Sequence, residues 1–258
     1  MGKQAAMLEE LQIKNAFLQR VHPTLKLSSL FVVFICMIFV YDIWRPLAVL
    51  LLTVAAVAFL GKIPLKLLLV LLLPFALFGF SFVWLQVVFP EERGSTVLFY
   101  IFQMPVALEN IQTGVSLGLR TMVFACWSLL FVLTTSPVGL VMSLIQKWRM
   151  PPSIGYGMMA AYRFLPQLRE ELTVIRRARQ IRGMGSKPKM REWRGMAVPL
   201  MAGAVRKAER TALAMESKGF DGSRNRTRYL QMNYKKTDMW FAAGFILFIT
   251  VVFLLPLL

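Results

Sequence analysis

Two basic residues, Arg182 and Lys218, stand out among the side chains that could make strong, directed contacts with another molecule. Each lies in the pattern Ala-x-x-x-basic-Gly, which occurs once at Ala178–Gly183 and again at Ala214–Gly219. Both copies fall at the end of a stretch with helical periodicity. A guanidinium or ammonium group at a helix end forms charge-assisted hydrogen bonds with carboxylates and carbonyls of a partner. We therefore predict that these residues dock on a soluble protein and do not catalyse a reaction.

The same pattern has a simpler interpretation as helix termination. Glycine is common directly after a helix, and a basic residue in the last turn interacts favourably with the helix dipole. In both copies, however, the basic residue also continues the apolar stripe of its helix, with Arg182 four residues beyond Ala178 and Lys218 three beyond Met215. We favour docking because two copies share this feature, and helix termination stays open as the alternative.

The patterns that enzymes require do not occur in this sequence. It contains no paired carboxylates within an apolar run, no Gly-x-Ser-x-Gly turn and no phosphate-binding Walker A loop. The single histidine, His22, has no second histidine or nearby cysteine to share a metal, and Cys36 and Cys126 lie in apolar runs. We expect no catalytic residue, no metal site and no cofactor in this chain, so any ATP is bound and hydrolysed by a partner.

Composition and charge predict an all-α polytopic membrane protein with about five transmembrane helices. The 258 residues are 57% hydrophobic and carry a formal net charge of +17. Of the 30 Lys and Arg residues, 21 lie between Ser136 and Thr237, together with six of the 13 acidic residues. A basic region next to apolar spans follows the positive-inside rule. Binding to nucleic acid is disfavoured because no recognition-helix or aromatic-basic pattern occurs.

The chain divides into four predicted parts. They are an N-terminal cytoplasmic segment (1–26), transmembrane helices 1–4 (27–136), a region of long amphipathic cytoplasmic helices (137–237) and a C-terminal transmembrane helix (238–258). Apolar runs predict the spans at residues 27–41, 47–60, 67–89, 114–135 and 239–258. Residues 97–108 are expected to lie in the membrane interface or to re-enter the membrane. If these residues formed a full span, or if the first two runs formed a single span, the predicted sides of the membrane on which the following segments lie would change.

The basic region contains two amphipathic helices. The first starts near Ser153 and has an apolar stripe at Leu165, Leu168, Leu172, Ile175 and Ala178. The second starts near Arg191, and its stripe of small residues is Ala197, Met201, Ala204, Ala208, Thr211 and Met215. Small residues let two helices approach closely, so we expect these helices to cross. Helix breaks are expected at Pro137, Pro151, Pro152 and Pro166.

Two charged residues near the outer membrane boundary have two interpretations each. Arg120 lies a short way into the fourth predicted span, where a charge is costly and often functional, but where it can also extend to the interface. Asp42 is more typical of an interface residue than of a proton relay. The sequence leaves the role of Arg120 open.

Several short motifs in a fixed order resemble the transmembrane T component of energy-coupling factor (ECF) transporters, the CbiQ-like EcfT family. That family ends its two cytoplasmic helices with Ala-Arg-Gly, which here reads Ile181-Arg182-Gly183 and Ser217-Lys218-Gly219, so both lack the Ala and the second has Lys for Arg. The other matching segments are His22–Leu27, Thr135–Pro137, Pro151–Pro152, Arg163–Pro166 and Gly219–Phe220. The resemblance covers about residues 20–258.

The resemblance implies a function in the cell membrane. Two ABC ATPase subunits would dock under the coupling helices, and ATP-driven motion would pass to a small substrate-binding membrane subunit, the S component. The implied ATPase-docking residues are Ala178, Ile181, Arg182, Gly183, Ala214, Ser217, Lys218 and Gly219. The implied contacts with the S component or between the coupling helices are Arg163, Pro166, Met201, Ala204 and Ala208. The substrate, set by the S component, is a vitamin, a vitamin precursor or a metal ion.

The alternative function is a membrane transporter, channel or scaffold that works without ATPases. The predicted spans contain few polar groups to line a path, and no inverted repeat is evident. A T component would be inert alone and would copurify with ATPases, which distinguishes it from this alternative.

Overall fold

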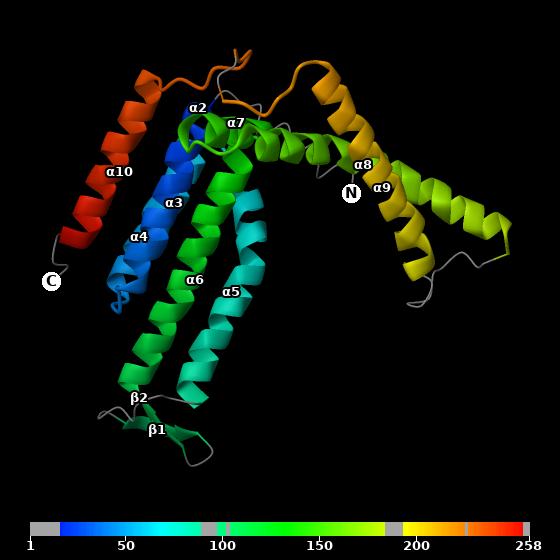
Figure 1. Cartoon of the computed structure of the whole chain (residues 1–258). Coiled ribbons are helices and arrows are strands. Elements are labelled where there is room, and N and C mark those ends of the chain that lie inside the picture. Colours follow the sequence, from blue (N-terminus) through cyan, green and yellow to red (C-terminus); the bar gives the residue numbers. More distant parts are fainter. Residues whose placement is uncertain (1–15, 89–96, 102–103, 184–192, 225–226, 255–258) are drawn as a thin grey trace. The chain divides into compact units, whose positions relative to one another are not determined.

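The computed structural model describes residues 16–88, 97–101, 104–183, 193–224 and 227–254. The chain divides into two compact units, residues 1–140 with 232–258, and residues 141–231. Helix α7 (Pro137–Lys147) contains the boundary between them. The elements of the first unit are α2 (Phe17–Arg20), α3 (Pro23–Ile38), α4 (Trp44–Phe59), α5 (Leu65–Val88), β1 (Val97–Ile101), β2 (Met104–Ala107), α6 (Leu108–Thr134) and α10 (Lys236–Leu254) (Figure 1).

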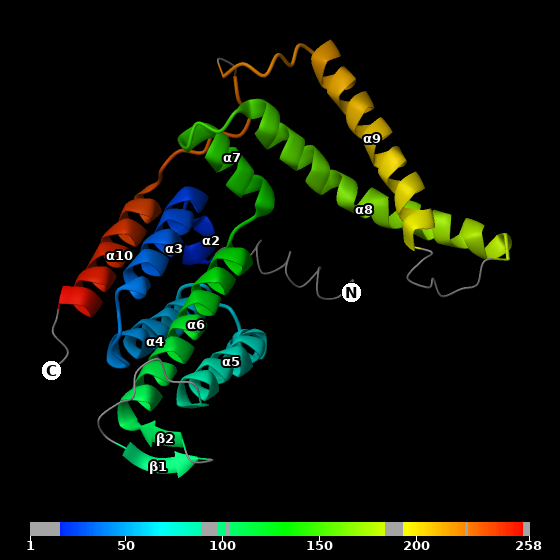
Figure 2. The same cartoon turned by 60° about the horizontal axis from the view of Figure 1, so that its bottom comes forward.

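Five apolar helices of the first unit confirm the predicted helical membrane fold. Helices α5, α6 and α10 are long and apolar enough to cross a membrane, and α3 and α4 are shorter apolar helices. A span needs roughly 20 residues, so the 16 residues of α3 and of α4 suffice only for a short crossing. Figures 1 and 2 show α3, α4 and α6 side by side, with α5 against α6.

The buried core lies where α3, α4 and α6 meet. Val33, Met37, Val49, Val57 and Val123 are each at most 1% exposed. Lipid is as apolar as these side chains, so close packing rather than exclusion from water holds such helices together. The β-branched valines have few rotamers to lose on packing.

Helices α5 and α6 approach one another through glycines that the sequence analysis did not single out. A Cβ atom on Gly79 would lie 3.0 Å from the carbonyl oxygen of Gly118, and a Cβ on Gly118 would lie 3.0 Å from that of Gly79. One turn before Gly118 in α6, a Cβ on Gly114 would lie 3.0 Å from the Cα of Val83. Gly114 and Gly118 form a Gly-x-x-x-Gly motif, which brings membrane helices into backbone contact.

The segment before α6 contains strands that the sequence did not predict. Residues 97–101 and 104–107 form the antiparallel pair β1–β2, and Leu108 is the first residue of α6. Their location in the membrane interface, or re-entry into the membrane, stays a prediction. Ile101 pairs with Met104 at the turn end, and Val97 pairs with Ala107 at the other end. Helix α6 also begins at Leu108, six residues before the predicted start, because polar residues at its amino end extend the helix past the apolar run.

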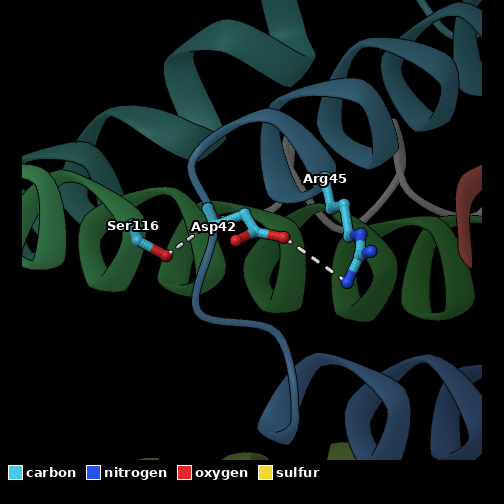
Figure 3. A network of polar contacts seen from close by, with 3 residues as sticks. All are labelled: Asp42, Arg45 and Ser116. Carbon is cyan, nitrogen blue, oxygen red and sulfur yellow. Dashed lines mark hydrogen bonds and ion pairs between the residues drawn. The ribbon is translucent and has the colours of Figure 1, made fainter. Parts of the chain in front are cut away.

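Polar contacts fasten the turn between α3 and α4 to α6 (Figure 3). The hydroxyl of Ser116 donates a 2.9 Å hydrogen bond to the carbonyl oxygen of Asp42, and the Asp42 carboxylate lies 3.4 Å from the Arg45 guanidinium. The guanidinium of Arg120 stands 5.1 Å from the centre of the Tyr41 ring, in a cation–π contact. Arg120 therefore packs on the same turn. The carboxylate of Asp42 is more than half exposed, as expected of an interface residue.

The second unit consists mainly of two long helices, α8 (Pro152–Ile181) and α9 (Trp193–Ser217). Pro137 begins α7, and Pro151 and Pro152 form the cap and first residue of α8, which confirms these predicted breaks. The predicted break at Pro166 is wrong, because α8 continues through it. Pro166 is exposed, and its neighbours on both sides supply enough helical turns to tolerate one missing N–H bond.

Candidate docking site

Helices α8 and α9 run antiparallel across one another, which separates the two basic helix ends. The ring of Tyr156 near the start of α8 lies 5.5 Å from that of Phe220, just after α9. Towards the other end, the guanidinium of Arg176 lies 5.9 Å from the centre of the Trp193 ring. Arg182 caps α8 six residues beyond Arg176, whereas Lys218 follows α9 two residues before Phe220, near the start of α8. The two cations therefore mark opposite ends of the helix pair.

The first end closes with a glycine in a left-handed conformation. Arg182 is the cap residue of α8, and its N–H donates a 3.3 Å hydrogen bond to the carbonyl of Ala178. Gly183 has φ +75° and donates a 3.0 Å hydrogen bond to the carbonyl of Gln180. Only glycine adopts this φ without strain, so Gly183 sets where the helix stops and leaves Arg182 at the tip.

The second end repeats this geometry. Gly219 has φ +79° and donates a 2.9 Å hydrogen bond to the carbonyl of Glu216, while Phe220 donates a 3.0 Å bond to the carbonyl of Met215. These two bonds constitute a Schellman motif, which satisfies the last carbonyls of α9. Lys218 thus occupies the same cap position as Arg182, as the repeated sequence pattern predicted.

Both basic side chains are exposed and available to a partner. Among the residues that the structure describes, neither the guanidinium of Arg182 nor the ammonium of Lys218 makes a hydrogen bond or ion pair. Next to Arg182, Ile181 is 87% exposed, an unusual position for a large apolar side chain. The other predicted docking residues, Ala178, Ala214 and Ser217, are exposed as well. Helix termination explains the glycines, but it does not explain an exposed isoleucine beside a free cation.

The crossing point of α8 and α9 is built by residues that the sequence analysis missed. The ammonium of Lys207 lies 3.0 Å from the carboxylate of Glu171, and Gly203 is buried against the same carboxylate. The predicted stripe holds in part: Met201 is 62% exposed and lies outside the crossing, whereas Ala204 is half-buried. The Glu171–Lys207 pair escaped the sequence analysis because its charges occupy positions that an apolar pattern does not reveal.

Beside the crossing, the two helices enclose a groove of about 640 Å³. Ala208 and Met215 of α9 face Gly157, Ala160 and Phe164 of α8 across it. Predicted contact residue Ala208 is therefore on the groove wall and accessible. Arg163 and Pro166, also predicted contacts, are exposed on α8.

A buried polar cluster in the first unit is another feature that the sequence analysis did not identify as a site. Lys26 is only 1% exposed, and its ammonium donates hydrogen bonds to the carbonyl of Thr134 (2.9 Å) and to the hydroxyls of Thr134 and Thr135 (3.3 and 3.5 Å). Near it, buried Asp238 accepts hydrogen bonds from the backbone N–H groups of His22 (2.7 Å) and Lys235 (2.7 Å). These bonds join the start of α3, the end of α6 and the start of α10. A positive charge at the carboxyl end of α6 also complements the helix dipole.

Replacing Lys26 with methionine is expected to destabilise the protein by about 1–3 kcal/mol, because the carbonyl of Thr134 would lose its partner inside the protein. The measurement is the temperature of aggregation of the full chain in mild detergent. Lys66→Met, which removes an exposed lysine of α5, is the matched control and should leave that temperature unchanged. Equal behaviour of the two variants would show that the Lys26 bonds do not contribute to stability.

The fold and the sequence together place the chain among membrane transport proteins. Residues 14–229 match the family CbiQ, described as cobalt transport protein, and the chain belongs to this family. The resemblance found in the short motifs is thereby confirmed. Membership makes the chain a transmembrane transport subunit that is not catalytic by itself.

Characterised relatives narrow this class to one kind of subunit. The chain is similar to the energy-coupling factor transporter transmembrane protein EcfT of Limosilactobacillus fermentum, at 29% identity over 93% of this chain and 92% of the relative. It is similar also to the EcfT proteins of Streptococcus thermophilus, at 29% over 88% and 89%, and of Bacillus subtilis, at 25% over 93% and 94%.

Proposed function

We propose that this chain, as the transmembrane energy-coupling subunit of an ECF-type importer, transmits ATP-driven motion from two ATPase subunits to a substrate-binding S component. The observation that carries the proposal is the pair of exposed cations, without a partner among the described residues, on glycine-terminated helix caps at opposite ends of α8 and α9. Two equivalent contact points on one helix pair match a partner that presents two similar subunits. The ATP and Mg²⁺ belong to those subunits.

Each docking contact consists of a helix end and its cation. At the first, Ile181 enters an apolar pocket of one ATPase, and the guanidinium of Arg182 donates paired hydrogen bonds to acidic or carbonyl acceptors beside that pocket. At the second, Lys218 offers a point charge, so this contact is geometrically looser. The remaining members of the two docking segments are Ala178, Gly183, Ala214, Ser217 and Gly219, which are small enough to let the partner approach the helix ends.

The membrane orientation follows from charge. The N-terminal segment, the turn at Lys62 and the basic region 137–237 lie in the cytoplasm, and the transmembrane parts are residues 27–136 and 238–258. The residues proposed to contact the S component or the other coupling helix are Arg163, Pro166, Met201, Ala204 and Ala208. The exposure of all but the half-buried Ala204, and the groove that Ala208 lines, support a surface for a membrane partner. The S component selects the substrate, which is a vitamin, a vitamin precursor or a metal ion.

Transmission of motion requires that α8 and α9 cross closely. A substitution at Gly203, which lies at the crossing, tests this requirement. Gly203→Leu is expected to reduce transport at least about tenfold, because the new side chain displaces the Glu171 carboxylate and separates the helices. Ala202→Leu, on the exposed neighbouring position, is the control. The measurements are substrate uptake and ATPase copurification in parallel. Normal uptake by the Gly203 variant would contradict a close, motion-transmitting contact.

The function itself is tested by purifying the chain from its native membrane in mild detergent and identifying the proteins that accompany it. We expect two ABC ATPase subunits and one small hydrophobic protein, whose identity would indicate the substrate. Recovery of a stable chain without ATPases would contradict the proposal and favour a self-contained transporter, channel or scaffold.

A further inference from the structure

An apolar groove of about 280 Å³ lies in the first unit. Its lining residues include Leu52 of α4, the cap residue Leu60, Leu130 of α6, and Trp240, Gly244 and Phe248 of α10. The hydroxyl of Thr53, which also lines it, already donates a 2.6 Å hydrogen bond within α4. The groove therefore presents a mainly hydrocarbon surface, and the one lining polar atom known to be buried without a hydrogen-bond partner among the described residues is Nε1 of Trp127.

The shape of the groove suits a hydrocarbon chain. Trp240, Gly244 and Phe248 recur every four residues along one face of α10, so the groove extends about 12 Å along that helix. This length fits inside one leaflet of a bilayer, whose hydrocarbon core is about 30 Å thick. A partner helix about 10 Å in diameter would need roughly 1,000 Å³ over the same length, far more than the groove provides.

The groove ends among exposed cations. Arg20 ends α2, Lys62 follows α4, and Lys236 begins α10, one turn before Trp240 on the same face. All three side chains are exposed.

Hydrogen bonds hold these three segments together. The N–H of Leu18 donates to the carbonyl of Leu60 (3.3 Å), which joins α2 to the end of α4. The N–H of His22, two residues after Arg20, donates to Asp238 of α10 (2.7 Å). The cations therefore lie around one end of the groove, at the side that we propose faces the cytoplasm.

No exposed acidic group offsets these cations in the described segments that carry them. Residues 16–24, 58–66 and 232–242 contain Arg20, Lys62, Lys66, Lys235 and Lys236, and Asp238 is their single acidic residue. Asp238 is only 3% exposed, and both its oxygens accept backbone N–H groups. An anion at this end would meet positive charge without a competing carboxylate at the surface.

We propose that the groove binds one acyl chain of an anionic phospholipid, with the lipid headgroup held by Arg20, Lys62 and Lys236. The apolar wall contacts the acyl chain from Trp240 to Phe248, and the cations bind the phosphate where the groove meets the membrane surface. Basic residues at the cytoplasmic surface attract anionic lipids in this way. The bound lipid would fill the space between α10 and α4, where the apolar packing of α10 is incomplete.

The test is lipid retention by the full chain purified from nanodiscs that contain equal amounts of phosphatidylcholine and phosphatidylglycerol. Native mass spectrometry counts the lipid molecules that remain bound. The wild type should retain one phosphatidylglycerol in preference to phosphatidylcholine. The variant Arg20→Gln with Lys62→Gln and Lys236→Gln should bind it roughly 100-fold more weakly, at about fivefold for each cation. Arg177→Gln with Arg206→Gln and Arg210→Gln removes the same charge elsewhere and should retain the lipid.

A second variant tests the groove without touching the charges. A Cβ atom added to Gly244 would meet no heavy atom within 4 Å, so Gly244→Leu places a side chain in the groove and should weaken retention at least about tenfold. Ala243→Leu, on the exposed adjacent position, should not. The proposal would be overturned if the triple charge variant and Gly244→Leu both retained the lipid as the wild type does. Equal binding of the two lipids, or displacement of a copurifying membrane protein in place of lipid, would overturn it as well. None of these outcomes bears on ATPase docking, which is measured separately.

Discussion

Reversing the charge at both helix tips, with Arg182→Glu and Lys218→Glu together, is expected to abolish copurification of the ATPase subunits while the chain still enters the membrane. Each tip places on an exposed helix cap a cation that has no partner in the described part of the chain, and acidic or carbonyl acceptors of the ATPase would desolvate it. Losing such a contact costs about 2 kcal/mol or more, so two reversals weaken docking by at least roughly 1,000-fold. The measurement is the amount of ATPase recovered with the purified chain.

A matched variant separates docking from net charge. Arg206→Glu with Arg210→Glu reverses two exposed cations within α9, away from both tips, and should leave ATPase recovery close to that of the wild type. Arg182→Glu alone should weaken recovery more than Lys218→Glu alone, because a guanidinium makes paired hydrogen bonds and an ammonium does not. Full recovery with the double tip variant would mean that Arg182 and Lys218 only terminate their helices.

Gly118→Leu is expected to prevent stable assembly of the transmembrane unit. A Cβ at this position already lies 3.0 Å from the backbone oxygen of Gly79, and backbone cannot move aside as a side chain can. Gly118→Ala should cost about 1–3 kcal/mol, and the longer leucine should cost more. The readouts are the yield of full-length chain in the membrane and its temperature of aggregation in detergent.

Gly244→Ala is the control for this effect, because its added Cβ meets no atom within 4 Å. There the replacement should be neutral or stabilising by up to about 1 kcal/mol, since alanine favours helix over glycine. If both glycine variants behaved alike, the backbone contact between α5 and α6 would not be what holds these helices together.

Features that depend on local sequence were predictable. Apolar runs identified the five apolar helices α3, α4, α5, α6 and α10 of the first unit, because hydrocarbon requires every backbone group to be satisfied within a helix. The repeated basic-Gly pattern located both helix ends, because a left-handed glycine stops a helix wherever it occurs. The ordered short motifs identified the family. The wrongly predicted break at Pro166 and the strands β1 and β2, about whose secondary structure the sequence made no prediction, arise where short proline or apolar signals are ambiguous.

Features that depend on which segments meet were decided by the tertiary structure alone. The antiparallel crossing of α8 and α9 sends Arg182 and Lys218 to opposite ends, and no periodicity within either helix specifies that direction. The Glu171–Lys207 bridge and the burial of Lys26 join residues 36 and 108 positions apart. The reciprocal contact of Gly79 with Gly118 likewise needs both helices in place. The sequence by itself determined where helices begin, end and carry charge, because those properties follow from neighbouring residues. Only the folded chain determined which of these groups are buried together, because partners distant in the sequence supply the missing hydrogen bonds and the close contacts.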